Sequence, residues 1–226
     1  LSPPPPPPPS PPGATACRPT CYASARRFPS QKRCLLPPQL PLINTLSPLF
    51  TGQEWIESQY AGSPVAWGFI FRHSFWLEHR LRFAEGIVYE DAECISKTFF
   101  WAKRIATLTQ FSVYNYVQRE GSTMHKDFTW HTLRSMATIV KSMNEFVRET
   151  VGGDPFFTHY YYNVGTGAYI NGLKHAAHDS GLAVHTGDYV KLVRAGGGAK
   201  ITARQPAKRF YQWLAIHCPR IFCKIA

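Results

Sequence analysis

The residues best suited to chemistry in this chain are two adjacent carboxylates, Glu90 and Asp91. They follow a glycine turn and the apolar residues 87–89, and the pattern beyond them predicts that a helix begins at Asp91. The free N–H groups and the macrodipole at a helix start keep a carboxylate ionised and oriented. A carboxylate held in this way can act as a general base that takes the proton from a hydroxyl group.

A purely structural interpretation of the same residues stays open. Acidic side chains are common in the first turn of helices because they complement the macrodipole. Glu90, Asp91 and Glu93 all fall in the expected first turn, and they need have no further role. The pair is therefore a candidate site whose meaning depends on the segments around it.

The elements that must position the pair are predicted from periodicity and turn residues. We expect a short helix over 53–60, a strand or extended segment over 65–71, and a short helix capped by Ser74 that ends at Arg80. The helix from Asp91 shows an apolar face at helical spacing, formed by Ile95, Phe99, Ala102 and Ala106. The later segments are predicted as a strand over 111–117, an amphipathic helix over 133–147, a helical segment with three glycines over 156–178, and a basic amphipathic segment over 208–216.

Residues 1–50 differ sharply in composition from the rest of the chain. They hold 15 of the 19 prolines and five of the 25 basic residues, but no Asp or Glu. The proline run over 3–12 predicts polyproline II or disorder, because proline fixes φ and has no N–H to donate. This lead is either a linker that binds SH3-like modules or not native coding sequence; Leu1 as first residue and the abrupt change near Thr51 favour the second interpretation.

The net charge of +11 points to anionic partners without choosing among them. Lys and Arg attract nucleic acid, anionic lipid headgroups and phosphorylated substrates by the same Coulombic interaction. The sequence has no run of 18 apolar residues and no charged segment followed by an apolar one at its start, so we expect a cytoplasmic protein. Reduced cysteines are expected rather than a zinc site; the alternative ligands would be Cys17, Cys21, Cys218 and Cys223.

Three segments follow one another in a distinctive order: PVAWGFIFR at 64–72, LRFAEGIVYED at 81–91 and YNYVQREGS at 114–122. Together they resemble bacterial family-two glycosyltransferases, which make cell-surface polysaccharides from nucleotide sugars. The resemblance covers roughly residues 52–124 and implies an α/β fold of the GT-A, or nucleotide-diphospho-sugar transferase, type. Composition and resemblance together predict a disordered Pro-rich lead over 1–50, the acceptor-side part of a GT-A domain over 51–126, and a helical C-terminal extension over 127–226.

The family's Glu-Asp pair falls on Glu90 and Asp91 of this sequence. The resemblance therefore implies that Asp91 is the catalytic base of an inverting sugar transfer and that Glu90 positions the acceptor. The further contacts that it implies are Trp67, Arg119 and Ser122 with the substrate, and His125 near a metal ion. An arginine such as Arg119 can hold a phosphate through two hydrogen bonds, although a solvated turn arginine is the alternative.

The donor side of the family is not found in this sequence. The complete fold binds Mg or Mn through an Asp-x-Asp motif, whereas no two aspartates of this chain are separated by one residue. We therefore expect a partial GT-A fold that lacks most of its N-terminal nucleotide-binding half. The partners expected from the resemblance are a nucleotide-sugar donor and a glycan or lipid-linked acceptor, with peripheral contact to the inner face of a membrane and no nucleic acid.

A second hypothesis is an inactive remnant or a non-catalytic basic module that binds anionic membrane, nucleic acid or a protein. The interleaved basic and aromatic residues over 208–213 suit such surfaces. Two weaker candidates are phosphate binding at 196–200 and a metal site, the latter shared by His175, His178 and His185.

Overall fold

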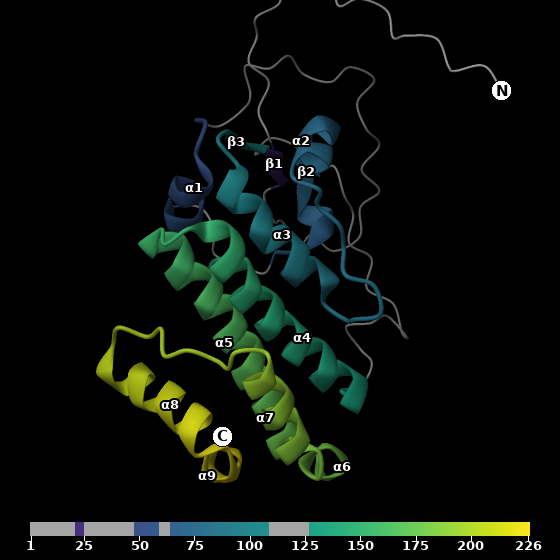
Figure 1. Ribbon diagram of the computed structural model, residues 1–226, viewed down its shortest axis with the longest axis vertical. Coiled ribbons are helices and arrows are strands. Elements are labelled where there is room, and N and C mark those ends of the chain that lie inside the picture. The colour runs from purple at the N-terminus through teal and green to yellow at the C-terminus, as the bar shows by residue number, and fades with distance from the viewer. Residues whose placement is uncertain (1–20, 25–47, 59–63, 109–126) are drawn as a thin grey trace, which may run out of the picture.

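The computed structural model describes residues 21–24, 48–58, 64–108 and 127–226. These residues form a mostly helical body with a small sheet at one end (Figure 1). The two longest helices, α4 (Trp130–Phe146) and α5 (Pro155–His178), lie side by side and run from the sheet end toward the opposite end. The described residues thus combine a three-stranded sheet with a helical body that includes every regular element after residue 127.

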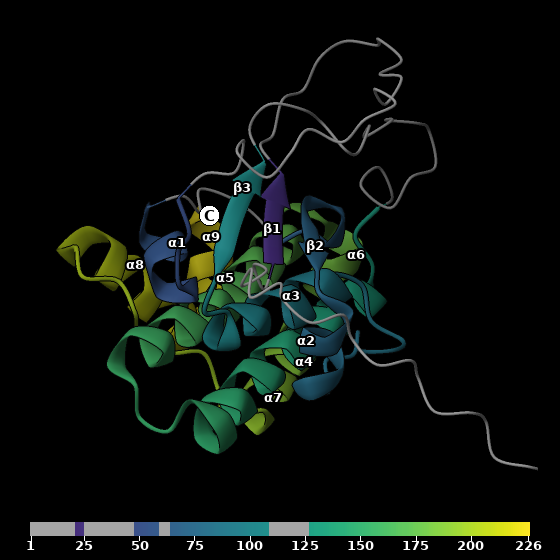
Figure 2. The ribbon, with the colours of Figure 1, turned by 90° about the horizontal axis from the view of Figure 1, so that it is seen from above.

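The sheet has the strand order β2-β1-β3. Strand β1 (Cys21–Ser24) pairs antiparallel with β2 (Phe69–Phe71), with Tyr22 opposite Ile70. It pairs in parallel with β3 (Ile105–Leu108) on its other side. Figure 2, viewed from above, shows β1 between its two neighbours. The middle strand is therefore the one that comes first in the chain.

Strand β1 lies within the Pro-rich lead, which we expected to be disordered throughout. Its four residues contain no proline, so each can donate its N–H to a neighbouring strand. At the other end of the lead, Phe50 exchanges backbone hydrogen bonds of 2.9 and 2.7 Å with Ile105. Disorder was therefore the wrong prediction for residues 21–24 and for Phe50, whose backbones pair with other strands. Residues 1–20 and 25–47 of the lead lie outside the described ranges.

Helix α3 (Glu90–Trp101), which carries the acidic pair, is shorter than its apolar pattern predicted. Ile95 and Phe99 are buried on its inner face as expected. Ala102 instead takes an extended backbone that ends the helix, and Ala106 lies in β3. The prediction of one continuous helix was wrong there because residues 105–108, which include β-branched Ile and Thr, bond to β1 instead.

The elements before α3 match the predicted pattern in outline. Helix α1 (Gly52–Ser58) and helix α2 (His73–Glu78) stand where short helices were expected. Ser74 lies inside α2 rather than at its cap. The residue at the N-cap position is Arg72, whose backbone is extended. The expected extended segment begins with the 3-10 turn η2 (Ala66–Gly68), and only its second half forms β2. The strand predicted over 111–117 lies outside the described residues.

The helices predicted over 133–147 and 156–178 are confirmed as α4 and α5. Helix α4 continues into one π-helical turn, η4 (Val147–Val151). Asp154 then caps α5, because its carboxylate accepts the N–H of Phe157 at 2.9 Å. Apolar residues of α3, α4 and α5 meet in a first core, which includes Phe99, Met143, Phe146, Phe157 and Tyr161.

The three glycines of α5 do not break this helix, although glycine has a low helix propensity. A Cβ at Gly165 would lie 3.6 Å from Val140 and Met143 of α4. A Cβ at Gly172 would lie 2.4 Å from the hydroxyl of Tyr189. The missing side chain at Gly172 lets α7 approach α5 closely, so packing there compensates for the low helix propensity of glycine, whereas the distances at Gly165 are those of an ordinary van der Waals contact.

Shorter helices complete the end of the molecule away from the sheet (Figure 1). They are α6 (Ser180–Ala183), α7 (Thr186–Ala195), α8 (Pro206–His217) and α9 (Pro219–Ile225). Helix α8 confirms the basic amphipathic segment predicted over 208–216. A second core joins these helices to α4 and α5 through Leu133, Tyr169, Leu173, Tyr189, Ala215 and Phe222. Within the described ranges, none of the helices has the length and apolar character needed to cross a membrane.

Candidate functional site

Asp91 lies half-buried in the first turn of α3. Its Oδ1 accepts a hydrogen bond from the N–H of Ala92 at 2.8 Å, and its Oδ2 accepts one from the N–H of Ala66 at 3.4 Å. The second bond joins α3 to η2. Two of the three segments singled out in the sequence, 64–72 and 81–91, therefore meet at this carboxylate.

The pKa of Asp91 is raised above its ordinary value. Burial is the largest cause, and the neighbouring charge of Glu90 adds to it, while the N–H groups of Ala92 and Ala66 act in the opposite direction. A carboxylate with a raised pKa is a better proton acceptor than an ordinary aspartate. The 2.8 Å bond from Ala92 and the longer 3.4 Å bond from Ala66 orient the carboxylate, so Asp91 combines a preferred orientation with a raised pKa, two properties that suit a general base.

Tyr89 enters α3 with a left-handed backbone, at φ 65° and ψ 34°. This conformation costs a residue with a side chain about 1–2 kcal/mol, so neighbouring contacts must hold it. One of these contacts is the hydrogen bond that the N–H of Val88 donates to Ser135 Oγ of α4 at 3.0 Å. Burial and the charge of Asp91 raise the pKa of the Tyr89 hydroxyl. A strained residue thus directly precedes the acidic pair.

The other acidic residues of the first turn have contrasting surroundings. Glu90 is exposed to solvent. Glu93 is 5% exposed, and its carboxylate contacts both the ammonium of Lys97 and the hydroxyl of Ser142. Lys97 Nζ also donates to Ser142 Oγ at 2.7 Å. Glu93 therefore belongs to a buried network between α3 and α4, and Glu90 and Asp91 remain as the candidates for chemistry.

The remaining predicted site residues are only partly within the described ranges. Trp67 is half-buried in η2, next to Ala66, whose N–H bonds to Asp91. Arg119, Ser122 and His125 lie outside the described residues. The site as described therefore consists of Asp91, Glu90 and Trp67.

Among the described residues, no group of three His, Cys, Asp or Glu side chains could hold a metal ion. His175 stacks on Phe128 with ring centroids 3.5 Å apart, and burial lowers its pKa. His185 stacks on Trp130 at 4.9 Å. The metal site considered for these two histidines and His178 is not formed, because the three side chains are not grouped around a common point. Two of the three rings pack against aromatic partners instead.

Residues 196–200 form a structural loop rather than a phosphate cradle. Asn144 of α4 donates from Nδ2 to the carbonyl groups of Gly196 at 2.9 Å and Gly198 at 3.0 Å. The ammonium group of Lys200 donates to the carbonyl of Gly197 at 2.7 Å. The ammonium group of Lys200 therefore bonds to its own loop and does not point outward to a phosphate.

Sequence reasoning missed two parts of the site. Ser135 is a polar residue at a buried position of an amphipathic helix, and such a residue signals a specific hydrogen-bond partner. That signal was available in the sequence. The left-handed backbone of Tyr89 was not predictable, because tyrosine has no preference for that conformation.

Comparisons of the chain with protein-family models, with curated proteins and with solved structures found no match. The chemistry of the site itself is therefore what indicates its function.

Proposed function

We propose that this chain is the acceptor-side part of an inverting glycosyltransferase of GT-A type, in which Asp91 is the general base. The observation that carries the proposal is the half-buried Asp91 carboxylate, oriented by the N–H of Ala66 and raised in pKa. An aspartate that only complemented the helix dipole would need neither burial nor a bond to a distant segment.

In the proposed reaction, Asp91 accepts the proton of an acceptor hydroxyl as that oxygen attacks the anomeric carbon of the donor sugar. The bond from the anomeric carbon to the nucleoside diphosphate breaks on the opposite face, which inverts the configuration. The proton ends on Asp91, and the negative charge leaves with the diphosphate. Only one positioned carboxylate is required on the acceptor side.

The neighbouring residues have supporting roles in this proposal. Exposed Glu90 accepts hydrogen bonds from other acceptor hydroxyls and positions the sugar. Trp67 offers an aromatic surface for a sugar ring beside Ala66. The expected reactants are a nucleotide-sugar donor and a glycan or lipid-linked acceptor, met in the cytoplasm in cell-surface polysaccharide synthesis.

The Mg or Mn ion of the complete family fold does not fit the described residues. The described part of the chain offers no cluster of carboxylates or histidines for such an ion, and the sequence has no Asp-x-Asp motif. No step above is assigned to a metal ion.

The proposal is tested with the full chain, a panel of UDP- and GDP-sugars with Mg and Mn, and a panel of saccharide and lipid-linked acceptors. The readout is the acceptor-dependent release of nucleoside diphosphate. The Asp91→Asn variant is expected to lower this release about 100-fold or more. Asp188→Asn is the matched control, because Asp188 is also in a first helical turn but is exposed. Equal release by wild type and Asp91→Asn, or no release with any pair, contradicts the proposal.

A further inference from the structure

The last part of the chain is uniformly basic. No acidic residue follows Asp188. Eight basic residues follow it, and they are Lys191, Arg194, Lys200, Arg204, Lys208, Arg209, Arg220 and Lys224. Among the described residues, the only one of these eight with a salt bridge is Lys191. This end of the molecule therefore presents positive charge to its surroundings.

Helix α8 has one buried face and one exposed aromatic face. Leu214 and Ala215 are buried, and the carbonyl of Ala215 accepts the hydroxyl of Tyr169 at 2.9 Å, so α8 is fixed to α5. On its outer face, Phe210 is 63% exposed and Trp213 is 42% exposed. Their rings stack with centroids 6.0 Å apart. Exposed Arg209 directly precedes Phe210.

Helix α9 repeats this combination with aliphatic residues. Phe222 is fully buried and holds the helix on the body. Ile221 and Ile225, one turn apart, are 55% and 67% exposed. Each is preceded by an exposed basic residue, Arg220 or Lys224. Exposed aromatic and aliphatic side chains thus alternate with cations over both terminal helices.

We propose that α8 and α9 bind the surface of a membrane that contains anionic lipid. Basic side chains beside exposed Trp, Phe and Ile are the pattern of helices that lie in the membrane interface. The cations pair with anionic headgroups, and the apolar side chains enter the boundary with the acyl chains. Exposed aromatic residues alone would also suit single-stranded nucleic acid, because bases stack on aromatic rings. The aliphatic side chains of Ile221 and Ile225 cannot stack in this way, and they favour lipid.

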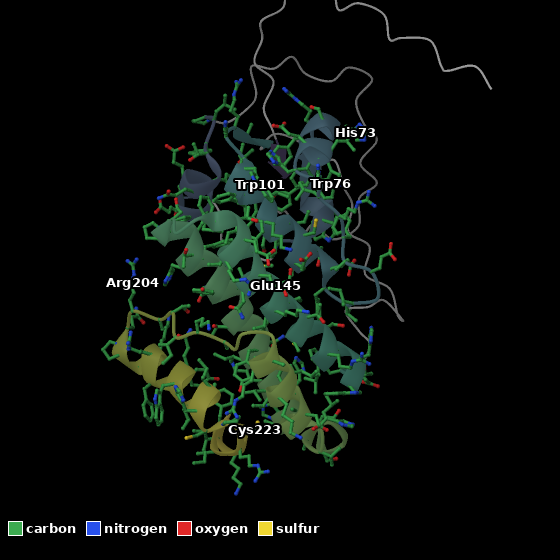
Figure 3. All side chains as sticks on the ribbon, viewed as in Figure 1. His73, Trp76, Trp101, Glu145, Arg204 and Cys223 are labelled. Carbon is green, nitrogen blue, oxygen red and sulfur yellow. The ribbon has the colours of Figure 1, made fainter. Side chains whose placement is uncertain are left out.

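The residues that carry this proposal lie on α8 and α9, whereas Asp91 lies at the start of α3 and its hydrogen-bond partner Ala66 in η2. Figure 3 shows Arg204 and Cys223 on the part of the molecule that carries α8 and α9, away from His73, Trp76 and Trp101. The proposal therefore does not depend on the role of Asp91.

The experiment measures co-sedimentation of the full chain with vesicles. One set contains phosphatidylcholine alone, and the other contains equal parts of phosphatidylcholine and phosphatidylglycerol. We expect binding to the anionic vesicles that weakens as salt is raised. The double variant Phe210→Ser with Trp213→Ser is expected to lower the partition coefficient about tenfold or more. The single variant Arg209→Gln is expected to lower it about fivefold.

Matched controls remove the same kinds of side chain at the sheet end. Leu77→Ser with Phe83→Ser removes two exposed apolar side chains, and Lys103→Gln removes one exposed cation. Both controls should bind vesicles as the wild type does. All of the changed residues are exposed, and circular dichroism verifies that each variant keeps its helices. Equal loss in the controls, no binding to anionic vesicles at low salt, or binding only to a single-stranded oligonucleotide overturns the proposal.

Discussion

Asp91 and Ala66 are 25 residues apart in the sequence, yet the Ala66 N–H donates to the Asp91 carboxylate at 3.4 Å. This bond is the point where the segment before β2 meets the start of α3. It orients a half-buried acid and leaves the neighbouring Glu90 exposed. Two adjacent carboxylates therefore differ in both burial and bonding to the segment before β2.

Burial of Asp91 predicts a pH-dependent cost to stability. Its pKa is raised in the folded chain, so the folded state favours the protonated form more than the unfolded state does. Below the ordinary value of 3.8 the carboxyl is protonated in both states and this cost is absent. As pH rises above that value, the wild type should lose stability relative to Asp91→Asn.

Urea unfolding of both proteins at a series of pH values measures this difference. The free energy of unfolding of the wild type should fall relative to that of Asp91→Asn as pH rises. A constant difference, or one in which the wild type gains stability relative to the variant, would show that the Asp91 pKa is not raised.

Close packing at Gly172 predicts opposite effects for two glycines of α5. In Gly172→Ala the new methyl group would meet the ring of Tyr189, which is fully buried and cannot easily move. We expect a loss of about 2 kcal/mol. Gly167→Ala is the control, because a Cβ there has no neighbour within 4 Å. It should gain about 0.5–1 kcal/mol from helix propensity. Similar effects at both positions, measured by urea unfolding, would contradict the packing of α7 against α5.

The buried network of Glu93 predicts a large cost for removing its cation. Lys97→Met leaves the Glu93 carboxylate without its ion-pair partner, and should destabilise the chain by about 3 kcal/mol at pH 7. Lys141→Met breaks an exposed pair with Glu145 on α4 and should cost less than about 0.5 kcal/mol. Equal midpoints in thermal unfolding of the two variants would rule out this network as a structural contact.

The sequence predicted the helices best where apolar spacing was long and regular. Over 133–147 the 3.6-residue pattern had enough turns to identify α4. The pattern misled at Ala106, because a short helix followed by a strand can continue an apolar spacing by chance. Pairing with β1, which is distant in sequence, decides the structure of residues 105–108. Local patterns cannot contain that information.

The candidate site was predictable in part for similar reasons. Adjacent acidic residues at a helix start identified Glu90 and Asp91, and the helix start is confirmed. The difference in burial between the pair depends on η2, and the strained Tyr89 depends on contacts such as the bond of Val88 to α4. The assignment of Arg119, Ser122 and His125 stays a prediction, because these residues lie outside the described ranges.

The proposed role of Asp91 is tested most directly by the pH dependence of acceptor-dependent nucleoside diphosphate release. A base must be ionised, so the wild-type rate should fall as pH falls through the raised pKa of Asp91, above 3.8. The Asp91→Asn variant should show a much lower rate without this step, and Asp188→Asn should keep the wild-type profile. The same step in the profile of Asp91→Asn would contradict the assignment of Asp91 as the base.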